Sequence, residues 1–175
     1  QGTLSQAQVK VTRGVAETNF KVSKSAGEVE VKAQIVDGSL PMQSALIQVL
    51  PGDAVRVGLS GDSQVLPAGG EAVASLTATL YDSFGNIANN GFRTVTLESN
   101  GGVQLLDLRD EDSNKAGVQV TTPDGRIYFR ALASTKVGPA DIIASLDGQT
   151  DGASRFTIDH IDSLRLSLAA EVANM

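Results

Sequence analysis

An internal repeat is the feature that most limits how this chain can fold. Shifting residues 8–35 forward by 111 positions places them on residues 119–146, and in both copies apolar and polar residues alternate. The turn residues between the alternating runs stay in step: Gly14 falls on Gly125, Ser23 on Ser134 and Gly27 on Gly138. Alternation with a period of two is typical of β-strands that bury one face. The repeat therefore predicts two copies of one strand arrangement.

The clearest predicted strand is the run in which Val29, Val31, Ala33 and Ile35 alternate with Glu28, Glu30, Lys32 and Gln34. Its counterpart in the second copy carries Ala140, Ile142, Ala144 and Leu146. A period close to 110 residues, made of short strands, is the size of an immunoglobulin-like β-sandwich. No stretch shows a sustained period of 3.6, so we expect an all-β chain of tandem immunoglobulin-like sandwiches with almost no helix.

The phase of the repeat predicts where the modules divide. Residues 53–161 hold one complete module, and Pro51 and Gly52 interrupt the strand pattern just before it. Residues 1–52 correspond only to the C-terminal strands of such a module, so the first module is predicted to be incomplete. Residues 162–175 resemble the first strand of a following module. A half sandwich exposes an apolar face and open strand edges, so we expect neighbouring modules or subunits to bind there.

The segment Asp82-Ser83-Phe84-Gly85-Asn86 separates two alternating runs, residues 76–80 and 93–97. Asp, Gly and Asn are typical turn residues, so the segment predicts a local β-hairpin. Further strands are expected over residues 6–12 and 16–22. Residues 67–70 are expected to form a loop before the strand at 72–81. Nothing in residues 1–52 corresponds to the Asp82 segment, which is why that segment indicates the phase of the repeat.

Composition and charge exclude several classes of function. The net charge is −6 and no cluster of Lys and Arg exceeds two residues, so nucleic acid is not an expected partner. The chain has no cysteine, which excludes disulfides, thiolate metal sites and cysteine catalysis. It lacks the run of about 18 apolar residues that a membrane helix needs, so no membrane insertion is expected. Residues 1–5 do not resemble a signal peptide.

Carboxylates are densest in the acidic stretch 107–114. Asp107, Asp110 and Asp112, with Glu111 among them, are candidate calcium ligands, since hard cations take several oxygen ligands from a flexible loop. The order of a dedicated calcium loop is missing, so a solvated loop is the alternative. Asp53, Asp159 and Asp162 are expected near module junctions, where calcium could stiffen an array. No other cofactor is expected.

No catalytic constellation is present, and the chain is not predicted to be an enzyme. His160 is the only histidine, and its strand parity, shared with Phe156 and Ile158, predicts a partly buried structural role. No Gly-x-Ser-x-Gly segment accompanies it. Most aromatic residues lie in predicted strands and are expected to be core or cross-strand residues. Phe84, in the turn, is expected to pack locally or against a neighbouring module or partner.

The motifs together resemble bacterial immunoglobulin-like domains of the invasin/intimin type (group 1). The residues that carry the resemblance, which covers essentially the whole chain, are Leu80 to Asn86 with Asp82, Gly85 and Asn86, then Thr122-Pro123-Asp124-Gly125 and Ser134 to Gly138. Ile87 departs from the proline that often follows Gly-Asn in that family, and the acidic insert at 107–114 is unusual. The resemblance implies a cell-surface or extracellular location and carries no catalytic residues.

We therefore expect a non-catalytic stalk or adhesion segment of a bacterial surface or extracellular protein, with a host or surface ligand as a further possible partner. One alternative is the subunit of an extracellular filament assembled by strand complementation, motivated by the incomplete first module. Another is an accessory module of a surface enzyme or lectin, with the activity elsewhere.

Overall fold

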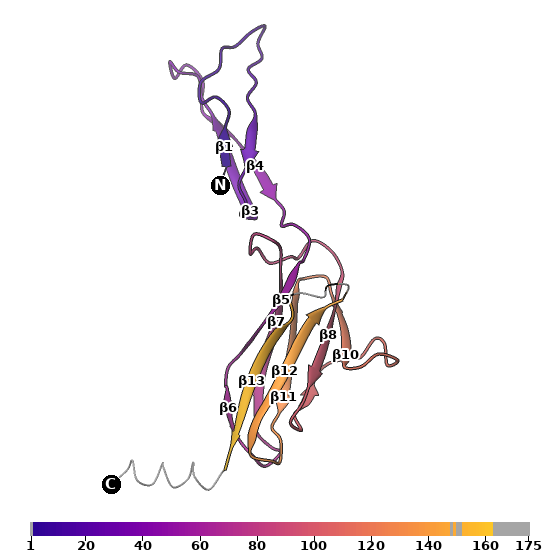
Figure 1. Ribbon diagram of the computed structural model, residues 1–175. Helices are drawn as coiled ribbons and strands as arrows, with labels where there is room; N and C mark the ends of the chain where they lie inside the picture. Colours follow the sequence, from indigo (N-terminus) through magenta and orange to yellow (C-terminus); the bar gives the residue numbers. More distant parts are fainter. Residues whose placement is uncertain (1, 148, 150–151, 163–175) are drawn as a thin grey trace, which may run out of the picture. The chain divides into compact units, whose positions relative to one another are not determined.

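The computed structural model describes residues 2–147, 149 and 152–162, and all of its regular elements are strands (Figure 1). The all-β prediction is confirmed, because no helix occurs among these residues. It follows that the described part contains no helix that could cross a membrane. The chain divides into two compact units, Gln1–Pro51 and Gly52–Met175, called unit 1 and unit 2 below. The strand predicted from Leu164 onward lies outside the described residues.

Unit 2 contains two sheets that face each other. The first has the order β5 (Arg56–Gly61), β7 (Val73–Tyr81), β11 (Arg126–Leu132) and β9 (Gln104–Leu106). The second has the order β10 (Val118–Thr122), β8 (Arg93–Ser99), β12 (Gly138–Leu146), β13 (Ser154–Ile161) and β6 (Val65–Pro67). All neighbouring strands are antiparallel except β13 and β6.

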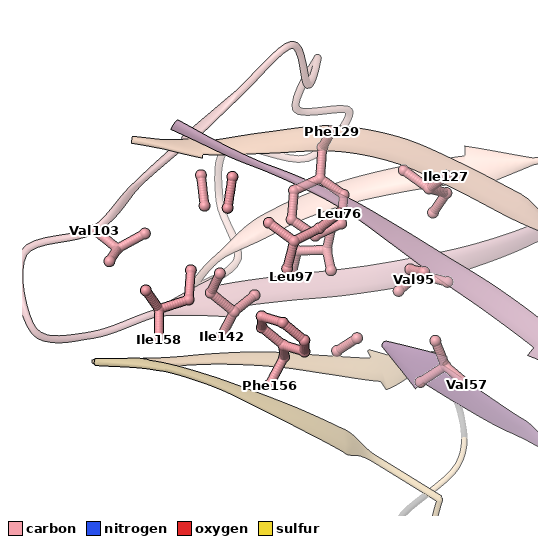
Figure 2. Close-up of a cluster of buried hydrophobic side chains, with 14 of the residues drawn as sticks. Val57, Leu76, Val95, Leu97, Val103, Ile127, Phe129, Ile142, Phe156 and Ile158 are labelled. Carbon is pink, nitrogen blue, oxygen red and sulfur yellow. The ribbon is translucent and has the colours of Figure 1, made fainter. Parts of the chain in front are cut away.

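The core of unit 2 lies between these two sheets, where alternate residues of both point inward (Figure 2). Leu76 and Phe129 extend from the first sheet, and Leu97, Ile142 and Ile158 from the second; each is at most 3% exposed. Each large aliphatic or aromatic side chain buried in this way contributes about 1.5–3 kcal/mol relative to an exposed position. The alternation in the sequence thus arises because every second residue of a strand faces the core between the two sheets.

The Asp82 segment forms the predicted turn, with an antiparallel bridge between Tyr81 and Ile87, but the two long strands that flank it do not pair as a hairpin. β7 precedes the turn and β8 follows it, but the two strands belong to different sheets. Both strands bury alternate residues in the same core, from opposite sides. A tight hairpin would have placed them side by side in one sheet, whereas burying both apolar faces against each other requires the chain to cross between layers.

Strand β6 was also missed, because Pro67 and the glycines after it indicate a loop. Its three residues pair in parallel with Asp159, His160 and Ile161 of β13. Proline has no N–H to donate, so it is tolerated at the end of an edge strand such as this one.

Unit 1 contains two separate two-stranded sheets. One pairs β1 (Gly2–Leu4) with β2 (Phe20–Val22), and the other pairs β3 (Gly27–Ala33) with β4 (Gln43–Val49). The strand predicted over residues 6–12 is wrong, since only an isolated bridge joins Thr12 to Val15. The strand predicted over residues 16–22 is shortened to β2. In unit 2 the corresponding strands β10 and β11 pair with β8 and β7, respectively. The described strands of unit 1 include no counterpart of β7 or β8.

The sequence repeat has a direct structural counterpart in the strand registers. Gly27 pairs with Val49 and Ala33 with Gln43 in β3–β4, while Gly138 pairs with His160 and Ala144 with Ser154 in β12–β13. These pairs are related by the same 111-residue shift that aligns the sequences. Gly27 and Gly138 both have positive φ, 136° and 121°. The hydroxyls of Ser23 and Ser134 accept equivalent backbone hydrogen bonds from Ser25 and Lys136, at 3.2 and 3.1 Å.

The paired turn glycines give a matched test of the packing in unit 2. Gly125 and Gly14 both have positive φ, 68° and 81°. A Cβ on Gly125 would lie 2.4 Å from the carbonyl oxygen of Ala88, whereas one on Gly14 meets nothing within 4 Å. We expect Gly125→Ala to lower the free energy of unfolding of unit 2 by at least the roughly 1–3 kcal/mol of a strained backbone.

Urea unfolding followed by circular dichroism measures this loss, with Gly14→Ala as the control that carries a similar strain without the collision. Equal denaturation midpoints for Gly125→Ala and the unchanged protein would contradict the packing described here.

Candidate functional site

The carboxylate of Asp82, directly after β7, accepts four hydrogen bonds. Only 1% of the residue is exposed. Its Oδ1 accepts backbone hydrogen bonds from Phe84 and Asn86, at 2.9 and 2.8 Å. Its Oδ2 accepts one from the Asn86 side-chain amide at 2.8 Å and one from the Gly52 backbone N–H at 2.9 Å. Gly85 allows this tight loop because its φ is +86°. One carboxylate therefore joins the loop after β7 to the first residue of unit 2.

The charge of Asp82 is stabilised where it is buried. Burial by itself raises the pKa of the carboxyl, but the hydrogen bonds from Asn86, Gly52 and Phe84 outweigh it and lower the pKa from 3.8 to about 2. Four donors to one carboxylate favour the ionised form, because each donates to an oxygen that carries negative charge. The sequence pattern identified this segment as a turn, but not its hydrogen bond to Gly52, thirty positions earlier.

The predicted calcium ligands point to different partners. Asp107 forms a two-point ion pair with Arg130, in which the Nη2–Oδ1 distance is 3.0 Å. Asp110 accepts backbone hydrogen bonds from Asp112 and Gln119, both at 3.1 Å. Among the described residues no group of three or more acidic, His or Cys side chains is arranged to hold a metal ion. Calcium binding by Asp107, Asp110 and Asp112 stays a prediction from the sequence.

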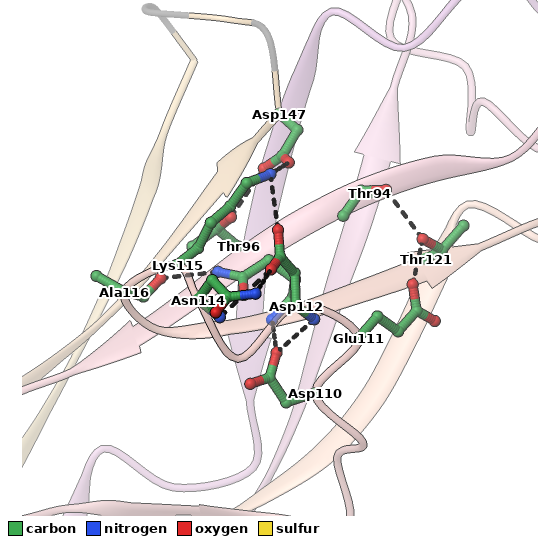
Figure 3. A network of polar contacts seen from close by, with 11 residues as sticks. Thr94, Thr96, Asp110, Glu111, Asp112, Asn114, Lys115, Ala116, Thr121 and Asp147 are labelled. Carbon is green, nitrogen blue, oxygen red and sulfur yellow. Dashed lines mark hydrogen bonds and ion pairs between the residues drawn. The ribbon is translucent and has the colours of Figure 1, made fainter.

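The acidic stretch is attached to the sheet of β8, β10 and β12 (Figure 3). Lys115 lies 3.6 Å from the carboxylate of Asp112 and 3.3 Å from that of Asp147, which follows β12. The hydrogen bond and charge of Asp147 are the main reason that the pKa of Lys115 is raised. Thr121 of β10 donates to Glu111 at 2.6 Å. Such exposed ion pairs are individually weak, so the loop is held by their number.

The remaining predicted site residues have structural partners or exposed positions. Asp53 forms an ion pair with Arg93 at 2.7 Å, and Asp159 and Asp162 are exposed. Junction calcium likewise stays a prediction. His160 is completely buried rather than partly buried, and its Nδ1 lies 3.1 Å from the carbonyl oxygen of Gly138. Its Nε2 has no hydrogen-bond partner among the described residues.

The aromatic side chains divide more evenly than the sequence suggested. Phe129 and Phe156 are buried, as expected of core residues. Phe84, Phe92 and Tyr128 are 58%, 72% and 67% exposed, so none of these three is a core residue. Tyr128 lies on the outer face of β11, opposite Thr77, because strand parity points it away from the core.

Two hollows on the described part of unit 2 each have a single ionisable side chain in their lining. The larger, of about 720 Å³, lies between β8 and β9 and contains one ionisable side chain in its lining, Glu98. The smaller, of about 590 Å³, contains Lys136 as its one ionisable group. General acid–base catalysis by a carboxylate pair needs two positioned groups at one cleft, and neither lining provides them.

Comparison with known proteins identifies the fold. No protein-family model and no curated protein sequence matches this chain. Among solved structures, InvD of Yersinia pseudotuberculosis matches 93% of this chain and 45% of its own, at 20% identity and a TM-score of 0.55. The Escherichia coli adhesin FdeC matches 91% of this chain and 51% of its own, at 16% identity and a TM-score of 0.51.

A glycosyl hydrolase family 2 member from Bacteroides cellulosilyticus matches 84% of this chain, at 16% identity and a TM-score of 0.56. The chain spans about a fifth of that enzyme and about half of each adhesin structure. The immunoglobulin-like β-sandwich expected from the sequence is confirmed, and so, at the level of the fold, is the likeness to bacterial adhesin domains.

Asp82→Asn tests the carboxylate cluster. The variant keeps the shape of the side chain but removes its charge and turns one amide N–H₂ toward existing donors. In the folded protein Asp82 stays ionised down to about pH 2, whereas an ordinary Asp takes up a proton near 3.8. The stabilisation is therefore fully present above the ordinary pKa and is lost as the pH falls toward 2.

We expect a lower urea midpoint for Asp82→Asn at neutral pH, and a difference from the unchanged protein that narrows below about pH 4. Asp159→Asn, on an exposed position of β13, is the matched control and should change little. A difference between Asp82→Asn and the unchanged protein that does not depend on pH would contradict the stabilised charge.

Proposed function

We propose that this chain is a non-catalytic immunoglobulin-like segment of a bacterial cell-surface or extracellular protein, where it acts as a spacer or adhesive stalk. The observation that carries the proposal is the path of the chain through unit 2. The chain enters at Gly52 and β5, at one end of the sandwich, and leaves after β13 at the other (Figure 1). A module with this connectivity adds its full length to the distance between its neighbours.

Hydrogen bonds identify the two ends of the sandwich. At the first end, the start of β13 lies beside β5, because the Ser154 hydroxyl accepts a hydrogen bond from the backbone N–H of Leu59 at 3.0 Å. At the other end, Ile161 pairs with Pro67 of β6. Tension applied between Gly52 and Ile161 would therefore act along the strands, where many backbone hydrogen bonds share the load.

The Asp82 cluster supports the spacer role at the point where the chain enters. Its bond to Gly52 holds the first residue of unit 2 against the loop after β7. A hydrogen bond to a charged acceptor contributes more than a neutral one. The first residue of unit 2 is therefore held to its own sandwich more firmly than a flexible Gly-rich segment would be.

The location and partners belong to the same proposal. FdeC is an adhesin, and its fold is shared with this chain, which supports a surface or extracellular location. Partners would be neighbouring modules or subunits at open strand edges, or a host or surface ligand.

A second candidate is an accessory module of a surface enzyme, with the activity in other domains. The fold match to part of a glycosyl hydrolase family 2 member favours it. A filament subunit is the remaining alternative, and the protein's state of association separates it from a spacer.

Limited proteolysis of intact cells tests the proposed location and role. In a bacterium that expresses the protein, trypsin should release peptides from residues 53–161 without lysis, since Arg109 and Lys136 lie in exposed loops. A cytoplasmic protein followed in the same samples is the control for leakage. Release of these peptides only after lysis would contradict a surface or extracellular location.

A further inference from the structure

Equivalent residues in the two units have different surroundings. Eleven side chains of β11, β12, β13 and the residues that continue these strands are buried in unit 2: Ile127, Phe129, Ala131, Ala133, Ala140, Ile142, Ala144, Leu146, Phe156, Ile158 and His160. Of their counterparts in unit 1, 111 positions earlier, only Val49 is buried. Val22 is 51% exposed where Ala133 is 4%, and Ile35 is 39% exposed where Leu146 is 4%. The same apolar pattern is therefore covered in one unit and uncovered in the other.

The strand edges differ in the same way. In unit 2, β12 pairs with β8, β11 with β7, and β13 with β6. In unit 1, β3–β4 and β1–β2 are two-stranded sheets with no further strand among the described residues. An isolated two-stranded sheet is at best marginally stable in water, and its outer edges present unpaired N–H and C=O groups. Unit 1 thus lacks the neighbours that stabilise its repeat copy.

Unit 2 also shows what would cover these edges. The β8 strand pairs with residues 142–146 of β12, which correspond to residues 31–35. The β7 strand pairs with residues 126–132, which correspond to residues 15–21. The β6 strand pairs in parallel with residues 159–161, which correspond to residues 48–50. The missing partner therefore has a defined set of strands, each with a defined register.

The connection through β1 indicates how this partner is attached. β1 pairs with β2 as β9 pairs with β11, and Leu4 opposite Phe20 occupies the place of Leu105 opposite Ala131. In unit 2 the strands β5–β8 come before β9 in the chain. A second copy of this chain offers no spare set among its described residues, because its own β5–β8 are already paired in unit 2.

We propose that unit 1 is the C-terminal part of a second immunoglobulin-like sandwich, whose other strands come from a segment related to Arg56–Ser99 and joined in the same polypeptide to the start of β1. This inference rests on the proposed function, in that it identifies the neighbour that the open edges bind. The segment pairs with residues 31–35, 15–21 and 48–50 in the registers of β8, β7 and β6.

The test supplies the proposed strands to the full chain. A copy of residues 52–102 is fused directly before Gly2, so that the added strands meet β1 as β5–β8 meet β9. Amide hydrogen exchange is then compared between the fused and unfused proteins. We expect exchange in residues 15–21 and 31–35 to slow at least tenfold on fusion, because paired and buried N–H groups are protected.

The matched control is the same fusion with Leu76→Asp and Leu97→Asp in the added copy alone, which should leave unit 1 unprotected. A third fusion, joined through a short Gly-Ser linker, relieves any strain at the junction. The inference would be overturned if amide exchange in unit 1 were unchanged in both fusions that lack the Asp substitutions, the direct one and the one with the linker. So would slow exchange of residues 31–35 in the unfused monomer, which would mean that unit 1 needs no partner.

Protection that develops in the unfused protein only as it associates would overturn the proposal in favour of a second copy. None of these outcomes affects unit 2, whose own amides report whether each protein is folded. The cell-surface assay is independent of them, so failure of this inference is distinguishable from failure of the proposed function.

Discussion

Covering the apolar face of each sheet is the constraint on which the rest of this structure depends. In unit 2 the two faces cover each other, and side chains such as Leu97, Ile142 and Ile158 lose almost all contact with water. Burial of this kind is the main favourable term in folding. Unit 1 has the same alternation and the same β-strand registers, yet its counterparts stay largely exposed. The difference between the units therefore lies in what is packed against the strands.

Asp82 shows how a polar group is accommodated within the same constraint. A buried carboxylate is costly unless donors replace its water, and here four donors do so. Two of these donors come from the loop backbone and one from Gly52, where the chain enters the sandwich. The cluster thus has two roles. It fixes the loop through which the chain leaves β7 for the second sheet, and it positions the first residue of unit 2.

The acidic stretch makes tertiary contacts that its sequence alone does not indicate. Asp107 and Asp110 are close in sequence, and their spacing suggested shared oxygen ligands for calcium. In the structure Asp107 pairs with Arg130 of β11, while Asp110 accepts hydrogen bonds from the backbone of its own loop and of β10. Unit 1 connects its equivalent strands β1 and β2 without a corresponding acidic stretch, so this loop is an elaboration of one copy of the repeat.

The sequence by itself determined the all-β class, the sandwich size of the repeat and which residues of β11–β13 share the core face. These follow from alternation and turn glycines, which are local properties of the chain. Only the tertiary structure decided that β7 and β8 lie in different sheets, that β6 runs parallel to β13 and that Asp82 binds Gly52. Each of these joins residues distant in sequence, and local patterns carry no information about which distant faces must meet to exclude water.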